Sequence, residues 1–384
     1  MERPPRILFA GGGTGGHVYP AIAIADAVRD ESPEAEIRFA GTRDKIEWEV
    51  VPRAGYRIAP ITISGLHRGQ PLRNVTLPFK LVKSYLESRK LVREFNPDVA
   101  VGTGGYVSGP VLMAASLRGK PIVIQEQNAY AGLTNRFLAK RAERIHVAFL
   151  EAKDFLPSEK CVFSGNPTRK DLTRADSVEA RRFYDLPPDA FVLVVFGGSL
   201  GSRAINETMV SNVKDMLQDE GLWIIWQTGR QYFKDVIRRV PNHPRLKVLE
   251  YVERMDLTYA AANLAVCRSG AITCSELMVT GTPAILIPSP NVAEDHQTHN
   301  ARSMANAGAA VLIPEEEMAS RLAEEVAALK SKSSRLRKMS EAARAIAKPE
   351  AANAIAKDIL AISRSKFQDP GSNTGSTFHG APRT

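Results

Sequence analysis

The sequence predicts an α/β fold built from two doubly wound domains, each with a parallel sheet. Short apolar runs alternate with segments of helical spacing along most of the chain, which is typical of βαβ units. The length of 384 residues exceeds that of one such domain. The stretch 165–189 contains Pro167, Pro187 and Pro188 and has little periodicity, so we expect the hinge between the domains there. In this fold class, ligands bind beyond the carboxyl ends of the strands.

The expected strands follow from the apolar runs. In the first half they are 6–10, 36–40, 57–61, 98–102, 121–125 and 145–148. In the second half they are 191–196, 222–226, 246–250, 263–267, 284–288 and 310–313. Residues 318–365 have a helical pattern that Pro349 is expected to interrupt. The tail 367–384 is rich in Gly, Ser, Pro and Thr and is expected to be disordered.

The composition indicates which classes of partner and which cellular compartment to expect. The net charge of +9 favours an anionic partner, which includes nucleic acid, a phospholipid surface or a phosphorylated substrate. The cysteines Cys161, Cys267 and Cys274 are odd in number and lack CxxC spacing, so we expect neither disulfides nor a zinc site. No signal core or membrane-spanning apolar run is present, so we expect a cytosolic protein.

Three strands are followed by glycine turns. The strand at 6–10 leads into Gly11–Gly16, where only Thr14 is not glycine, and then into a helical pattern that begins near His17. The segments 99–106 and 191–202 repeat this layout. Any one of these turns alone is most simply a tight βα connection that needs glycine for its geometry. Together, they predict a site between the domains that holds a diphosphate against backbone N–H groups.

The first glycine turn also fits a dinucleotide-binding fingerprint, Gly11-x-Gly13-x-x-Gly16. That fingerprint requires an acidic residue at the end of the second strand, where this chain has Ala40-Gly41-Thr42. We therefore do not favour a nicotinamide dehydrogenase. Because Asp-x-Asp, HExxH and Walker-lysine motifs are absent, we expect no metal and no cofactor.

Polar residues follow several other strands. They form the clusters 125–128, 267–276 and 295–300. Ser269 or Thr273 could cap the helix that begins after the strand at 263–267. Glu276 could complement that helix dipole or bind a ribose diol. We expect Gln297 to face the site, and His296 or His299 to lie on the solvated surface.

The segment 68–93 is basic and apolar. It carries Arg68, Arg73, Lys80, Lys83, Arg89, Lys90 and Arg93, interleaved with leucines, valines, Phe79 and Tyr85. One interpretation is an ordinary core helix with a solvated basic face. The other is a surface helix that lies on anionic lipid.

Seven motifs, in order, resemble one family. They are GGGTGGHVYPA (11–21), GTGGYVSGP (102–110), QEQNAYAGLTNR (125–136), SGNPTR (164–169), FGGSLGSRAIN (196–206), CRSGAITCSE (267–276) and DHQTHNA (295–301). This pattern is similar to the MurG family, the membrane-associated UDP-N-acetylglucosamine (UDP-GlcNAc) transferases of peptidoglycan synthesis. The family acts on undecaprenyl-diphospho-muramoylpentapeptide. The chain departs mildly from the pattern, for example at Thr103 and Gln125.

The resemblance implies a GT-B fold, in which two Rossmann-like domains face each other across a cleft without a catalytic metal. It implies an N-terminal acceptor and membrane-associated domain (1–166) and a C-terminal UDP-GlcNAc domain (167–345). A helix at 346–366 would pack back on the first domain, and 367–384 form the tail. The protein is expected at the cytoplasmic face of the inner membrane, bound through 68–93, with no nucleic-acid partner.

The implied reaction is an inverting transfer of GlcNAc to the C4 hydroxyl of N-acetylmuramic acid. Such a displacement needs a base, which we interpret as His17, with Glu126 as the alternative. On the acceptor side, the resemblance also places Gly104, Gly105 and Tyr106. The donor residues that it implies are Thr14, Gly15, Gly16, Asn128, Arg169, Ser199, Val252, Ala271, Ile272, Thr273, Cys274, Ser275, Glu276 and Gln297.

Two other classes of function stay open at this point. Another GT-B enzyme, such as a UDP-GlcNAc 2-epimerase, would share the nucleotide site but would not need the segment 68–93. A basic nucleic-acid-binding protein would explain the charge but not the three glycine turns, and no recognition motif supports it.

Overall fold

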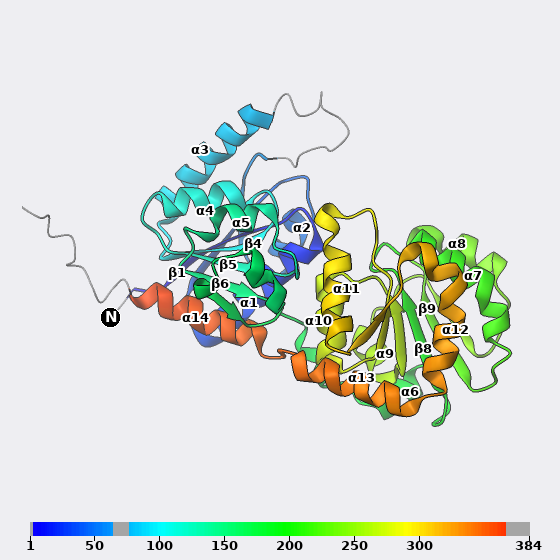
Figure 1. The fold of residues 1–384 in the computed structure, drawn as a ribbon. Helices are drawn as coiled ribbons and strands as arrows, with labels where there is room; N and C mark the ends of the chain where they lie inside the picture. The colour runs from blue at the N-terminus through cyan, green and yellow to red at the C-terminus, as the bar shows by residue number, and fades with distance from the viewer. Residues whose placement is uncertain (1–2, 64–76, 366–384) are drawn as a thin grey trace, which may run out of the picture.

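The computed structural model describes residues 3–63 and 77–365. It contains two parallel sheets, one in each half of the chain, and the two halves lie side by side (Figure 1). The strands of the first sheet are β1 (Arg6–Gly11), β2 (Glu36–Gly41), β3 (Arg57–Pro60), β4 (Val99–Gly104), β5 (Ile122–Glu126), β6 (Arg144–Val147) and β7 (Cys161–Phe163). Those of the second are β8 (Phe191–Phe196), β9 (Leu222–Gln227), β10 (Leu246–Leu249), β11 (Leu264–Cys267), β12 (Ala284–Leu286) and β13 (Ala310–Leu312).

Both sheets are doubly wound. The order is β3-β2-β1-β4-β5-β6-β7 in the N-terminal domain and β10-β9-β8-β11-β12-β13 in the C-terminal domain. In register, Phe9 of β1 lies opposite Phe39 of β2 on one side and Val101 of β4 on the other. The predicted fold class is therefore confirmed, with strand ends close to those expected. The strand β7 was missed because Cys161–Phe163 is short and only partly buried.

Helices cover both faces of each sheet. In the N-terminal half they are α1 (Gly15–Glu31), α2 (Glu47–Arg53), α3 (Leu77–Phe95), α4 (Ser108–Ser116) and α5 (Leu133–Ala139). The C-terminal half has α6 (Ser177–Phe183), α7 (Arg203–Met216), α8 (Arg230–Arg239), α9 (Met255–Ala261), α10 (Ala271–Thr280), α11 (His296–Asn306), α12 (Met318–Lys330), α13 (Ser333–Ile346) and α14 (Ala351–Ser365). Short 3₁₀ turns are η2 (Leu150–Phe155), η3 (Ser158–Lys160), η4 (Lys170–Thr173), η5 (Ala293–Asp295) and η6 (Glu315–Glu317).

Two details of the helices differ from the sequence prediction. The stretch 165–189 contains α6, which its weak periodicity did not predict. The helical region 318–365 is interrupted around Pro349 as expected, but also between α12 and α13. The predicted tail 367–384, together with Arg68 and Arg73, lies outside the described residues.

The last helix, α14, returns to the N-terminal domain (Figure 1). Its Ile355 and Ile359 share an apolar cluster with Ile24 of α1. Oδ2 of its Asp358 lies 3.1 Å from Nε2 of His146 on β6, and the side chain of His146 is almost fully buried. Burial of these apolar groups removes their surface from water and fixes α14 beside α1.

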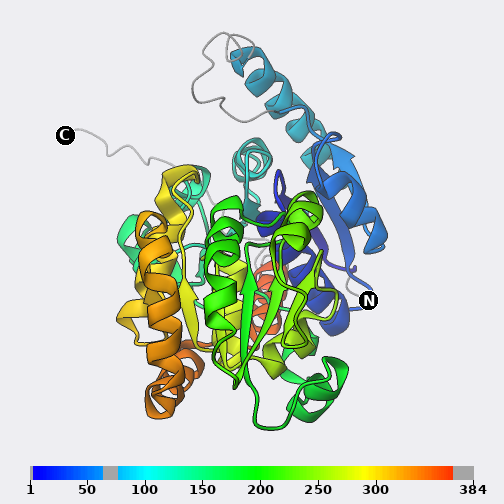
Figure 2. The same cartoon turned by 90° about the vertical axis from the view of Figure 1, so that its right-hand side faces the viewer.

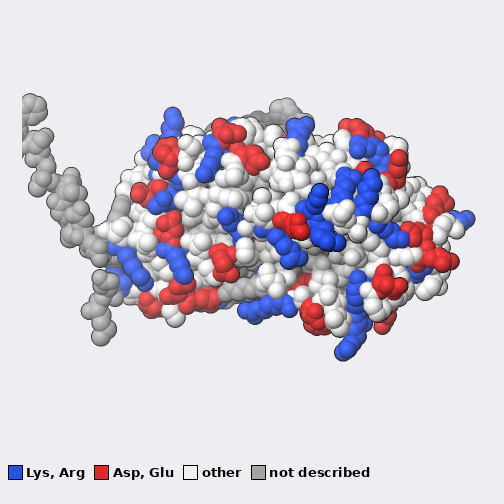
Figure 3. Space-filling model, turned by 60° about the horizontal axis from the view of Figure 1, so that its bottom comes forward, with Lys and Arg blue, Asp and Glu red and all other residues white. Residues whose placement is uncertain are grey.

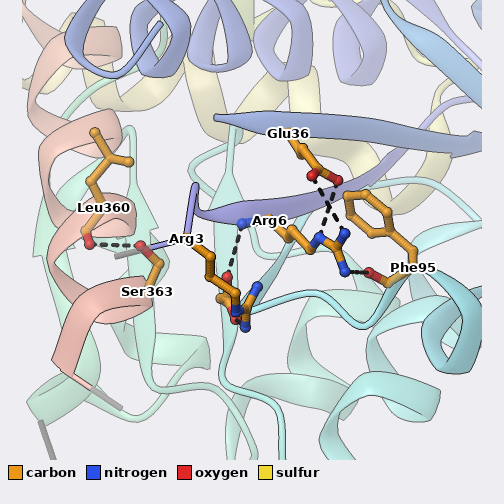
Figure 4. A network of polar contacts seen from close by, with 7 residues as sticks. Arg3, Arg6, Glu36, Phe95, Leu360 and Ser363 are labelled. Atoms are coloured by element: carbon orange, nitrogen blue, oxygen red, sulfur yellow. Dashed lines mark hydrogen bonds and ion pairs between the residues drawn. The ribbon is translucent and has the colours of Figure 1, made fainter. Parts of the chain in front are cut away.

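The amino ends of the first strands are tied together by charge (Figure 4). Arg6 at the start of β1 lies 3.1 Å from Glu36 at the start of β2. Its main-chain N–H donates to Asp98, just before β4, and Arg3 pairs with the same carboxylate. These polar contacts join the amino ends of the strands, and the glycine turns lie at the carboxyl ends.

Helix α3 projects from the N-terminal domain (Figure 2). Phe79, Val82 and Leu86 on α3 are 78%, 62% and 55% exposed. In the described residues, no helix has the length and apolar character needed to span a bilayer.

Charge on the underside of the molecule is mixed. Basic and acidic side chains are interspersed on the face drawn in Figure 3, with a group of basic side chains over the C-terminal domain. Among the residues that the structure describes, this face carries no continuous basic band.

Candidate active site at the domain junction

The first glycine turn joins β1 to α1 and is backed by a buried carboxylate. Glu47, at the start of α2, is 0% exposed. Its Oε2 accepts a hydrogen bond from the N–H of Gly13 at 2.9 Å, and its Oε1 accepts from the N–H and hydroxyl of Thr42. No ion pair to Glu47 is found within the described residues. The carboxylate of Glu47 therefore already accepts from one of the backbone N–H groups that could otherwise bind an anion.

The second glycine turn, after β4, packs directly on the first. A Cβ atom at Gly104, whose φ is +98°, would lie 2.8 Å from Nδ1 of His17. A Cβ atom at Gly105 would lie 2.2 Å from the carbonyl oxygen of Gly12. Only glycine permits this approach, so the turn places the His17 ring against its own backbone.

His17 lies in the first turn of α1 and is partly exposed. Its Nδ1 is 3.0 Å from the carbonyl oxygen of Thr103 and 2.9 Å from Oε1 of Gln127. Because both partners are acceptors, the hydrogen-bond network assigns the proton to Nδ1. Nε2 then carries the lone pair, as a general base requires.

Glu126, at the end of β5, is only 1% exposed. Its Oε1 accepts from the N–H of Asn128 at 2.9 Å. Its Oε2 accepts from the N–H of Gly132 at 2.9 Å and from the side chain of Asn135 at 2.7 Å. Both oxygens are therefore used to hold the loop between β5 and α5.

The third glycine turn, between β8 and α7, is backed by a cation instead. Arg268, at the end of β11, donates to Oγ of Ser202 at 2.7 Å and forms an ion pair with Glu315. Gln227 donates to the carbonyl of Gly198 at 2.9 Å and accepts from the N–H of Val252 at 2.8 Å. Ser199, in the same turn, is exposed.

Near the N-terminus of α10, a carboxylate lies beside an arginine. Glu276, one turn into α10, accepts a hydrogen bond from the hydroxyl of Tyr259 at 3.1 Å and lies 3.7 Å from Nε of Arg169. Burial raises the pKa of Glu276, although the charge of Arg169 opposes that shift. A half-exposed arginine and a carboxylate therefore lie near the N-terminus of α10, whose N-cap residue Gly270 makes no side-chain capping bond.

Hydrogen bonds join the two domains at this place. Asn300 of α11 is fully buried, and its Oδ1 accepts from the N–H of Ala129 at 2.8 Å. Its side-chain amide donates to Oδ1 of Asn128 at 3.1 Å. The ring of His299 stacks on Tyr130, with centroids 5.0 Å apart, and both His296 and His299 are partly exposed.

Several predicted residues do not offer side chains to the site. Cys274 and Ser275 are buried, and burial raises the pKa of the Cys274 thiol. Gly270 is the N-cap residue of α10, and no side chain caps it. The capping role considered for Ser269 or Thr273 is therefore wrong, and Ser269 donates to the carbonyl of Gln297 instead.

Other predicted residues remain accessible. Oε1 of Gln297 accepts from the N–H of Ser289, which leaves its amide nitrogen as the available donor. Thr14, Gly16 and Tyr106 are exposed.

Sequence reasoning gave no role to four residues of the junction. They are Glu47, Gln127, Asn166 and Asn300. Gln127 and Asn300 lie in the polar clusters that the sequence indicated, and Asn166 lies in a quoted motif, so their position was a usable signal. Glu47 lies outside the motifs, and only its place shortly after the second strand could have indicated it.

A groove of about 740 Å³ lies elsewhere, against α6 and α13. It is lined by Thr280 and Gly281 at the C-terminal end of α10. The ten-residue helix places this end about 15 Å from Ala271, at 1.5 Å per residue. Of the site residues described above, the groove includes Tyr259, and it lies away from the start of α10. In the described residues, no cluster of His, Cys, Asp or Glu is arranged to hold a metal ion.

Comparisons with known proteins agree with this geometry. Residues 7–147 match the model of the glycosyltransferase family 28 N-terminal domain, and residues 192–359 match that of the family 28 C-terminal domain. A relative from Salinibacter ruber is 55% identical over 94% of this chain and 98% of its own length. It is named UDP-N-acetylglucosamine–N-acetylmuramyl-(pentapeptide) pyrophosphoryl-undecaprenol N-acetylglucosamine transferase.

Solved structures give the same result at the level of fold. A crystal structure of MurG from Acinetobacter baumannii is 29% identical and has a TM-score of 0.77, covering 93% of this chain and all of that one. A UDP-GlcNAc 2-epimerase from Neisseria meningitidis has a TM-score of 0.63 at 13% identity, covering 93% of this chain and all of that one. The epimerase shares the fold, and its low identity supports nothing further.

Proposed function

This chain belongs to glycosyltransferase family 28 and, within it, to the MurG transferases, and from this premise we propose that it transfers GlcNAc from UDP-GlcNAc to undecaprenyl-diphospho-MurNAc-pentapeptide. One arrangement of residues carries the proposal. His17, with Nδ1 against Thr103 and Gln127, lies on the N-terminal domain, and the mostly buried Glu276 lies beside Arg169 on the C-terminal domain. Hydrogen bonds through Asn166 connect the two halves.

In the proposed reaction, the C4 hydroxyl of MurNAc attacks the anomeric carbon of GlcNAc while UDP leaves from the opposite face. Nε2 of His17 accepts the hydroxyl proton. Glu126 is a weaker candidate for the base, because donors occupy both of its oxygens and its side chain is buried. We therefore assign Glu126 to positioning the loop that carries Asn128.

The donor would bind to the C-terminal domain. The proposed contacts of the diphosphate are Arg169, Ser199 and the N–H groups at the start of α10, which supply positive potential without a metal. Glu276 would accept hydrogen bonds from the ribose diol. Since the N–H of Val252 is bonded to Gln227, its carbonyl is the group proposed to read uracil.

Thr14, Gly15 and Gly16 would approach the donor from the opposite domain. Asn128 and Gln297 would contact the sugar. Gly104, Gly105 and Tyr106 would face the acceptor, and Tyr106 is 54% exposed.

We propose that α3 binds the anionic membrane surface from which the acceptor is drawn. Phe79, Val82 and Leu86 follow helical spacing and are exposed, whereas a core helix would bury such a face. Basic side chains flank them, as expected for a helix that contacts anionic headgroups. Replacing Lys80, Lys83, Arg89 and Lys90 with Gln should reduce co-sedimentation with phosphatidylglycerol vesicles.

A matched control removes four basic residues from α13: Arg335, Arg337, Lys338 and Arg344. If both quadruple variants bind vesicles equally, α3 is not the membrane contact.

The reaction itself is tested by UDP release from UDP-GlcNAc, with and without the lipid-diphosphate acceptor. A transferase releases UDP only when the acceptor is present. An epimerised sugar formed without acceptor, either free or still linked to UDP, would identify a 2-epimerase. Neither UDP release nor epimerisation under either condition would contradict both enzymes and return the nucleic-acid-binding alternative.

A further inference from the structure

A buried chain of side-chain hydrogen bonds connects His17 to the C-terminal domain. Nδ1 of His17 contacts Oε1 of Gln127 at 2.9 Å, and the side-chain amide of Gln127 contacts Oε1 of Gln125. Gln125 donates to Oδ1 of Asn166 at 2.8 Å, and Asn166 donates to Oγ of Ser275 on α10 at 2.9 Å. We propose that this amide relay positions His17 for catalysis and couples its orientation to the donor helix α10. The inference rests on the proposed function.

The orientation of Gln127 follows from its neighbours. Its Nε2 is surrounded by acceptors, namely the carbonyl oxygen of Thr103 at 2.7 Å, the carbonyl oxygen of Gln125 at 3.0 Å and Oε1 of Gln125. The opposite assignment would direct Oε1 at three acceptors. Oε1 must therefore face His17, where it accepts a hydrogen bond from Nδ1–H. The lone pair of the neutral ring then lies on Nε2.

At the other end, Asn166 is fixed by both domains. Its side-chain amide donates to the main-chain oxygen of Gln127 at 3.0 Å as well as to Ser275. Ser275 also donates to the carbonyl of Ala271, in the first turn of α10. Movement of α10 relative to the first domain would therefore act on Asn166 and, through Gln125, on Gln127.

The four side chains that link His17 to α10 are all buried, so their hydrogen bonds depend on one another. The exposed fractions of Gln125, Gln127, Asn166 and Ser275 are 0%, 2%, 2% and 3%. Buried amides are costly unless their donors and acceptors are paired, so a shift of one member disturbs the next. Thr103 and Gln125 both contact Gln127.

The relay transmits orientation rather than charge, because it contains no ionisable group before His17. The carboxylates on the neighbouring elements are bonded elsewhere. Glu126 on β5 binds the 128–135 loop, and Glu47 on α2 binds Gly13 and Thr42.

The first test reads the tautomer of His17 by ¹⁵N NMR of the full-length protein with labelled histidine. His17→Ala identifies the signal. Wild-type protein should show the proton on Nδ1. Gln127→Leu leaves the carbonyl of Thr103 as the acceptor at Nδ1, so it should raise the share of the Nε2–H form without making that form complete. Wild-type protein with the proton mainly on Nε2 would overturn the proposal, whether or not the enzyme transfers GlcNAc. A wild-type enzyme that shows the expected tautomer but no transfer would instead contradict the proposed function.

The second test uses Ser275→Ala, which removes the shorter of the two hydrogen bonds from Asn166 to α10 and leaves the one to the carbonyl of Ala271 at 3.4 Å. Its matched control is Ser363→Ala on α14, since Ser363 is also a buried serine that donates to a carbonyl of its own helix (Figure 4). For a coupling of ordinary strength, Ser275→Ala should lower kcat about 2- to 30-fold and alter the His17 signal. The Kd for UDP should change less than kcat.

The control should change neither kcat nor the His17 signal. If Ser275→Ala behaves as Ser363→Ala does, or if it weakens UDP binding as much as it lowers kcat, the link from α10 to His17 is absent.

Discussion

The glycine turn after β1 and the glycine turn after β8 have the same layout but opposite electrostatic support. Each follows a buried strand and leads into a helix at the carboxyl edge of a parallel sheet. The first is backed by Glu47, which accepts from the N–H of Gly13. The second is backed by Arg268, which donates to Ser202 and is paired with Glu315.

This difference explains how two similar turns can serve different substrates. A buried carboxylate behind the first turn disfavours a further negative charge, whereas the balanced pair behind the second does not. The half-exposed Arg169 adds a cation near the second site. A glycine turn therefore predicts a close approach of the backbone, and the side chain beneath it decides which charge can approach.

The largest expected effect is at the first turn. His17→Ala should lower kcat by about 10²- to 10⁴-fold, the usual contribution of a general base. The Kd for UDP, measured by calorimetry, should stay near that of wild type, because UDP is assigned to the other turn. Equal losses in kcat and UDP affinity would place His17 in the donor site and remove the contrast between the turns.

At the second turn, Arg268→Met should weaken UDP binding about 10-fold, or about 1.4 kcal/mol, because it removes a positive charge from behind the turn. The variant releases Ser202 and leaves Glu315 without its partner. UDP affinity is measured by calorimetry, with urea unfolding to check that the fold is kept. A folded variant with unchanged UDP affinity would show that the cation behind this turn does not support the nucleotide.

The corresponding change at the first turn is Glu47→Gln, which keeps the shape of the side chain. One of its atoms becomes a donor facing another donor, at Gly13 or Thr42. The free energy of unfolding in urea should fall by about 1–3 kcal/mol, the cost of an unsatisfied buried group. UDP affinity should not change. A loss of UDP affinity as large as that of Arg268→Met would contradict the division of roles.

Much of the fold could be predicted because its determinants are local. An apolar run such as Phe191–Phe196, followed by glycines and a helical pattern, specifies strand, turn and helix from adjacent residues. Ligand sites at the strand ends follow from the fold class. The strand β7 and helix α6 were missed because their short sequences are only partly buried and have weak periodicity.

The partners of the site residues could not be predicted, because they come from distant parts of the chain. Glu47 meets Gly13 across 34 positions, and Asn166 meets Ser275 across 109. Local spacing carries no information about such pairs. Glu126 is a different case, because its partners Asn128, Gly132 and Asn135 are near in sequence, but their hydrogen bonds depend on how the loop folds back on the carboxylate. Spacing alone did not show that fold, so Glu126 looked like a possible base.

The smallest expected effect concerns pH at the second turn. Burial raises the pKa of Glu276, so its carboxylate is lost at a higher pH than that of an exposed glutamate. If the carboxylate binds the ribose diol, UDP affinity should fall as the pH falls, by at most about 10-fold per pH unit. Calorimetric titrations of wild type and Glu276→Gln from pH 7.5 to 5 test this, because their difference removes the titration of UDP itself. Arg169 opposes the shift, so Arg169→Met should move the loss of affinity to still higher pH. An identical pH dependence in wild type and Glu276→Gln would mean that Glu276 supports α10 through Tyr259 and does not bind ribose.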